Sequence, residues 1–145
     1  MSKGQFYGRE TADVPPVSPE YASVRDPRAL YDLLLGVWRA DTCAPRMRQD
    51  WSPDNPTLGQ CSITAFLAQD IFGGKVYGVP LEDGNFHCFN RVGDRVFDLT
   101  SEQFGDVRLD YGNCTEQFRE VHFAKAEKKQ RYEYLKALLD AKLFA

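Results

Sequence analysis

The chain has 145 residues, 43% of them hydrophobic, which is enough for one buried core and too short for two ordinary domains. Its net charge of −3 offers no broad basic surface for a phosphate backbone, so we expect no nucleic-acid binding. The N-terminus lacks the apolar segment of a signal peptide, and no apolar run approaches the roughly 20 residues of a bilayer span. We therefore expect a cytoplasmic protein with no membrane contact and with reduced cysteines.

Residues 1–25 are polar, rich in proline and without a clear period. We expect them to form an extended, poorly ordered or surface-draped arm ahead of a single domain over residues 26–145. Asp26 followed by Pro27 is typical of a helix N-cap and first turn, and leucines at helical spacing then predict a helix over 27–39.

The middle of the chain changes from loop to buried helix. Prolines and glycine break up residues 41–59, where Trp51 is expected to fix the loop to the core or to form a wall of a cleft. The segment 62–72 is apolar on most faces, which predicts a buried helix that begins at Cys61 and ends at Gly73.

Strands follow the buried helix. Residues 75–79, 85–92 and 95–99 carry strand patterns, and Gly93-Asp94 between the last two predicts a hairpin. Thr100 and Gln103 are spaced as a capping box for a short helical turn. Residues 105–125 give no clear prediction, and a final helix is expected near 126–142 with its alternating charges on a solvated face. This order of elements predicts an α+β fold.

The predicted hairpin brings two polar side chains together. With a two-residue turn at Gly93-Asp94, Val92 pairs with Arg95 and His87 pairs with Thr100. His87 and Asp98 then lie on one face as diagonal neighbours, at a Cβ separation of roughly 7–8 Å. An odd-length turn would place Asp98 on the opposite face.

Cys61 is the candidate nucleophile. A thiol reacts as the thiolate, which a helix N-terminus and a nearby imidazolium both stabilise. Cys61 lies at the predicted helix N-terminus. Of the two histidines, His87 is the better placed to supply the imidazolium. We predict that Cys61, His87 and Asp98 form a catalytic site in which Asp98 orients His87.

The segments GQCSITAFLAQDIFGG, FHCFN and FDLTSEQF resemble the YunG-like family of small bacterial proteins over approximately residues 38–140. The family's cysteine, histidine and aspartate match Cys61, His87 and Asp98. Their order along the chain also resembles that of papain-like and transglutaminase-like cysteine enzymes. Cys88 stands where the family usually has a bulky aromatic residue, and Gln60 is too close to Cys61 to take the role of the papain group's oxyanion glutamine.

The resemblance and the residues together predict a papain-like α+β core in which the Cys61 helix packs on an antiparallel sheet. We expect a hydrolase or acyltransferase that acts on an amide or thioester of a peptide or small molecule, without a cofactor. Trp51, Gln60 and Asn90 are candidate cleft residues, with Asn90 expected to hydrogen-bond the loop that carries Trp51.

Other readings of the same residues stay open. The domain could bind a peptide or small molecule in this cleft without catalysis, or respond to oxidants through Cys61 and a second thiol. The four cysteines and two histidines could also ligate zinc, but no pair has the spacing of a structural site, so we expect no metal. Arg46 and Arg48 could bind a substrate carboxylate, although solvation is the more common state of such arginines.

Overall fold

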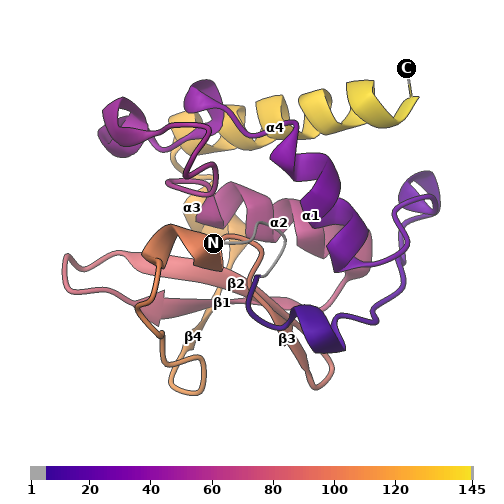
Figure 1. The fold of residues 1–145 in the computed structure, drawn as a ribbon, viewed down its shortest axis with the longest axis horizontal. Helices are drawn as coiled ribbons and strands as arrows, with labels where there is room; N and C mark the ends of the chain where they lie inside the picture. Colours follow the sequence, from indigo (N-terminus) through magenta and orange to yellow (C-terminus); the bar gives the residue numbers. More distant parts are fainter. Residues whose placement is uncertain (1–5, 145) are drawn as a thin grey trace.

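Helix α2 lies between an antiparallel sheet and helix α4 (Figure 1). This computed structural model describes residues 6–144. The helices are α1 (Pro27–Leu35), α2 (Cys61–Phe72), α3 (Arg119–His122) and α4 (Ala126–Phe144). The strands are β1 (Lys75–Pro80), β2 (Phe86–Val92), β3 (Arg95–Phe97) and β4 (Thr115–Gln117), in the sheet order β3-β2-β1-β4. All neighbouring strands are antiparallel, so the prediction of an α+β fold is confirmed.

Helix α2 is buried on nearly every side, as its apolar sequence predicts. One side packs on the sheet against Val76 and Cys88, and the other meets α1 and α4 in the main core. The helix ends at Phe72 because Gly73 and Gly74 both adopt positive φ, at 79° and 73°. This turn reverses the chain directly into β1.

Helix α1 begins as predicted, with the Asp26 carboxylate accepting a hydrogen bond from the backbone N–H of Ala29 at 2.9 Å. It ends at Leu35 rather than at residue 39. Gly36 is a poor helix former, and the N–H groups of Val37 and Trp38 both bond to the carbonyl of Leu34. The expected last turn is therefore a tight turn that buries Trp38.

The β2–β3 hairpin has the predicted register: Val92 pairs with Arg95 and Asn90 with Phe97. Gly93, with a φ of 61°, occupies the turn. The second strand ends two residues earlier than predicted. Asp98 forms an isolated antiparallel bridge with Tyr7 of the N-terminal segment, and its N–H donates to the Tyr7 carbonyl at 2.9 Å.

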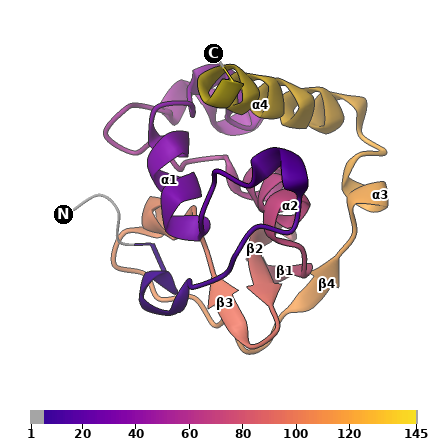
Figure 2. The same cartoon turned by 90° about the vertical axis from the view of Figure 1, so that its right-hand side faces the viewer.

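Residues 6–25 lie against the domain and contribute side chains to its main core (Figure 2). Phe6, Val14, Tyr21 and Val24 are almost completely buried there. The remaining residues of the predicted arm, 1–5, lie outside the described residues. Within 6–144, no helix combines the length and apolar character needed to cross a bilayer.

The segment without a sequence prediction, 105–125, contains β4 and α3. Strand β4 pairs with β1 through only three residues and extends the sheet at that edge. The turn after Thr100 is a 3-10 helix over Ser101–Phe104, but the predicted capping box does not form. Gln103 instead donates from its side chain to the carbonyl of Thr100 at 2.9 Å.

Candidate functional site

Cys61 is the first residue of α2, and its half-buried thiol lines a cavity of about 610 Å³. The sulfur lies 4.0 Å from the carbonyl oxygen of Phe86 on β2. Gly59 precedes it with a φ of 71°, and a Cβ there would lie 2.4 Å from the Cys43 sulfur. Glycine at this position therefore allows the backbone to turn tightly into the helix that presents the thiol.

His87 and Asp98 are in contact, as the hairpin register predicts. His87 Nε2 lies 2.6 Å from Asp98 Oδ2, and neither side chain is more than 1% exposed. The carboxylate also accepts a hydrogen bond from the Tyr111 hydroxyl at 2.6 Å and one from the Thr100 N–H at 3.2 Å. The rings of Phe104 and His87 pack edge to face, with their centroids 4.7 Å apart. These contacts fix the imidazole and leave Nδ1 available to the thiol.

The electrostatics favour a protonated His87. Burial alone would lower the pKa of His87, but the charge and hydrogen bond of Asp98, together with Cys61, raise it to about 10. The imidazole is therefore cationic at neutral pH when it faces the thiol.

Cys61 has a thiol pKa held well below its ordinary value. A hydrogen bond from Cys88 is the largest cause, and the hydrogen bond and charge of His87 act in the same direction against the cost of burial. Cys88 itself is buried against Ala65, Phe66 and Val76, in the core as predicted. The arrangement can hold a thiolate beside an imidazolium, the reactive state of a nucleophilic cysteine.

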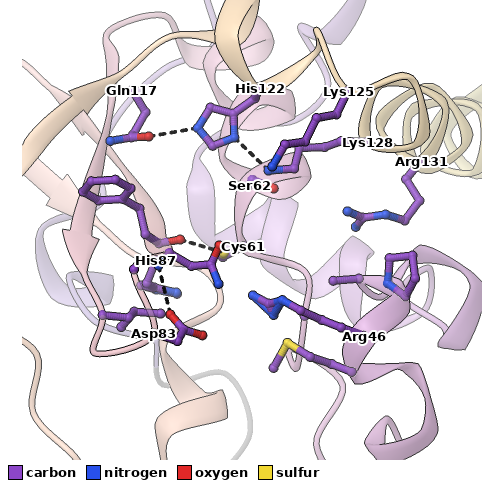
Figure 3. A pocket seen from close by; sticks show the side chains of 18 of the residues that line it. Arg46, Cys61, Ser62, Asp83, His87, Gln117, His122, Lys125, Lys128 and Arg131 are labelled. Atoms are coloured by element: carbon purple, nitrogen blue, oxygen red, sulfur yellow. Dashed lines mark hydrogen bonds between the residues drawn. The ribbon is translucent and has the colours of Figure 1, made fainter.

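The wall of the cavity nearest α3 and α4 carries a chain of hydrogen bonds (Figure 3). His122 Nε2 lies 2.9 Å from the Gln117 side-chain oxygen, and Lys128 Nζ lies 2.9 Å from His122 Nδ1. Burial, then the charge of Lys128, lowers the pKa of His122 to about 4. His122 is therefore neutral, with Nε2–H donating to Gln117 and Nδ1 accepting from Lys128.

The prediction that the charges of the last helix are a solvated face is wrong for two residues. Lys128 and Arg131 line the cavity, and Arg131 is buried, with its side chain bonded to the carbonyl of Thr42 at 3.1 Å. Their spacing from Leu135 places them on the same stripe as the buried leucines, and this was the signal available in the sequence. Tyr111, by contrast, lies in the segment that gave no prediction and had no such signal.

The expected cleft residues lie elsewhere. Asn90 is buried and donates to the Ala65 carbonyl at 2.8 Å, so it joins β2 to α2 and does not bond the loop that carries Trp51. Gln60 is fully buried, with its side-chain nitrogen 3.2 Å from the Arg39 carbonyl. Trp51 donates to the Pro56 carbonyl within its own loop at 3.0 Å. All three lie outside the set of residues that line the cavity.

The two arginines in the loop before Cys61 differ in whether they line the cavity. Arg46 is exposed and lines the cavity, whereas Arg48 donates to the carbonyls of Ala40 and Cys43 and so stabilises its own loop. All four cysteines are free thiols in the structure, and residues 6–144 contain no cluster of three or more His, Cys, Asp or Glu side chains suited to a metal ion.

Comparison with known proteins identifies the family. A family model described as YunG protein matches residues 26–144. The chain belongs to the YunG family. A relative from Bacillus subtilis (strain 168), described as "Uncharacterized protein YunG", is 33% identical over 86 residues, which cover 59% of this chain and 71% of that protein. No solved structure matches the chain. The region shared with the YunG family includes Cys61, His87 and Asp98, and it begins after the N-terminal segment.

Proposed function

We propose that this protein is a cysteine-dependent hydrolase or acyltransferase that acts on an amide or thioester. The observation that carries the proposal is the Cys61 thiol at the start of α2, beside a cavity and next to the buried His87–Asp98 pair. Cys61 is the nucleophile, His87 the acid and base, and Asp98 orients His87. A papain-like arrangement is part of the proposal, because the cysteine helix packs on the antiparallel sheet, which carries His87 on β2 and is followed by Asp98 directly after β3.

In the first step, the Cys61 thiolate attacks the carbonyl carbon and a carbon–sulfur bond forms. The backbone N–H of Cys61 lies at the helix start, where donors have no intrahelical acceptor, and can stabilise the developing oxyanion. The bond to the leaving nitrogen or sulfur breaks as the His87 imidazolium transfers its proton to that atom. The product of this step is an acyl-enzyme with neutral His87.

In the second step, water or an amine attacks the acyl-enzyme. Neutral His87 accepts the proton of the attacking group, the carbon–sulfur bond breaks, and the thiolate–imidazolium pair is restored. Attack by water makes the protein a hydrolase, and attack by an amine makes it an acyltransferase. Asp98 stays bonded to Nε2 through both steps, which keeps Nδ1 directed at the reacting atoms.

The test is the pH dependence of iodoacetamide alkylation at each cysteine, mapped by mass spectrometry in the wild type and in His87→Ala. We expect Cys61 to react with a pKa well below the ordinary value of about 8.5, and with a higher pKa in the variant, which lacks the imidazolium. Cys114 serves as an internal reference in the same samples, since burial raises the pKa of its thiol. An ordinary or unreactive Cys61 in both proteins would exclude the catalytic proposal.

The alternative is a non-catalytic domain that binds a peptide or small molecule in the same cavity. The observation in its favour is the cavity volume of about 610 Å³, which is within the usual range for small-molecule sites. Cys61→Ser distinguishes the two once a ligand is found. The substitution abolishes turnover in an enzyme, whereas it leaves the affinity of a binding domain unchanged.

A further inference from the structure

Positive charge dominates the lining of the cavity beside Cys61. Its cationic side chains are Arg46, Lys125, Lys128 and Arg131, and its acidic side chains are Asp83 and Glu127. The whole chain is acidic, with a net charge of −3, so this concentration of cations is a local feature and not a consequence of composition.

The acidic side chains of the cavity already have partners. Glu127 accepts a hydrogen bond from Arg131 Nε at 2.6 Å. The Asp83 carboxylate accepts one from the N–H of Asn85 at 2.9 Å, and this bond, with a smaller contribution from the charge of Arg46, lowers the pKa of Asp83. Glu127 is therefore paired with Arg131, and the cationic charge that acts on Asp83 is that of Arg46 and not that of a lysine.

Arg46, Lys125 and Lys128 are the cations that remain, and the two lysines lie together beside His122. Among residues 6–144, no ion pair includes either of them. Lys128 is half-buried, and its ammonium bonds to the neutral ring of His122, which Gln117 holds from the other side. Two hydrogen bonds thus fix the position of an uncompensated charge, an arrangement suited to receiving an anion.

The lysines and His87 lie on different sides of the thiol. In Figure 3, Lys125, Lys128 and His122 lie on one side of Cys61 and His87 lies on the other. A carbonyl attacked by Cys61 would lie toward His87, and a negatively charged group of the same molecule would then reach the lysines.

We propose that the substrate carries a carboxylate close to its reactive carbonyl, and that Lys128, positioned by His122 and Gln117 and assisted by Lys125, binds that carboxylate. The inference rests on the proposed function and specifies its substrate class: an amide or thioester of a carboxylate-bearing acid. A carboxylate is favoured over a phosphate, because phosphate sites in proteins usually combine several converging backbone N–H donors, and the charged groups beside His122 are two ammonium ions.

Two alkylating reagents of nearly the same shape test this inference without a known substrate. Iodoacetate carries a carboxylate and iodoacetamide a neutral amide, and both transfer their carbon to the thiolate with loss of iodide. The ratio of their rates at Cys61 cancels any effect on the thiolate itself. We expect this ratio to be higher in the folded protein than for Cys61 in urea-unfolded chain.

Lys128→Met should lower the ratio by about two- to fivefold, the usual size for a partly solvated charge pair. Lys129→Met is the matched control: Lys129 is an exposed neighbour on α4 that does not line the cavity, and its removal should leave the ratio unchanged. In the wild type the ratio should also fall as salt is raised, a measurement that does not depend on any variant folding.

A ratio that is the same in folded and unfolded protein would overturn the inference. So would a Lys128→Met variant in which both rates fall in proportion, because Lys128 would then stabilise only the thiolate. Protection of Cys61 from iodoacetamide by phosphate and not by malonate, at equal ionic strength, would overturn the assignment to a carboxylate. The iodoacetamide rate alone reports on the proposed function, so failure of that proposal is distinguishable from failure of this one.

Discussion

At the scale of single residues, the site depends on buried groups that lower the pKa of the Cys61 thiol. Cys88 is the clearest example, because it is 1% exposed and yet has the largest effect on the pKa of Cys61. The sequence identified Cys88 only as a core residue. Its contact with Cys61 depends on how α2 lies across β2, and no local pattern contains that information.

Cys88→Ala should therefore raise the pKa of Cys61, since the thiolate loses its hydrogen bond from the Cys88 thiol. The midpoint of the Cys61 alkylation curve should move to higher pH, with His87 still in place. Cys43→Ala removes another buried thiol outside the cavity lining and should leave the midpoint unchanged. An unshifted midpoint in Cys88→Ala would show that His87 and the helix start are sufficient.

The His87–Asp98 pair should also make stability depend on pH. The folded-state pKa of His87 is about 10 and lies above the ordinary value of 6.5. The stabilisation from the protonated imidazole is therefore complete below about pH 6.5 and is lost as the pH rises through about 10. Urea unfolding in the Cys61→Ala background, where the thiol no longer contributes to the raised pKa of His87, should show the free energy of unfolding falling from about pH 6.5 upward, because Asp98 still raises that pKa. Cys61→Ala/His87→Ala should lack that fall, and an equal fall in both proteins would contradict the assignment to His87.

At the scale of elements, the sequence predicted those whose pattern is local. The apolar segment from Cys61 to Phe72, the hairpin register at Gly93 and the last helix could all be predicted, because spacing and turn residues determine them. The hairpin register alone was enough to bring His87 to Asp98, two of the three proposed catalytic residues.

Elements that depend on tertiary contacts could not be predicted. Strand β4 is the polar triplet Thr115–Gln117, which is a strand only because the edge of β1 is available for pairing. Helix α3 spans four residues, too few for a periodic pattern. These two elements carry Gln117 and His122, so the chain of hydrogen bonds to Lys128 was missed together with them.

At the scale of the whole molecule, the N-terminal segment is connected to the proposed catalytic site. Tyr7 accepts a backbone hydrogen bond from Asp98, and its ring stacks on Tyr111 at 4.0 Å, which in turn donates to the Asp98 carboxylate. The family match begins at residue 26 and does not include this segment. In this protein the segment therefore supports a site whose three main residues all belong to the shared region.

Deletion of residues 1–25 should destabilise the protein and weaken the site together. Several fully buried apolar side chains of this segment would be lost from the core, at about 1.5–3 kcal/mol each. Removing Tyr7 would also free one side of Asp98, so the Cys61 alkylation midpoint should rise toward that of an ordinary thiol under conditions where the domain remains folded. Urea unfolding and cysteine alkylation measure the two effects.

Val14→Ala is the matched control, because it removes one buried apolar side chain of the segment and keeps the contacts of Tyr7 with Asp98 and Tyr111. It should lower the stability and leave the reactivity of Cys61 unchanged. If the deletion lowered stability but left the Cys61 midpoint unchanged, the segment would contribute only to the core. If it changed neither, the packing of Phe6, Val14 and Tyr21 would add nothing to the folded state, contrary to their burial. A joint loss is the expected result, because Asp98 receives contacts both from the core and from this segment.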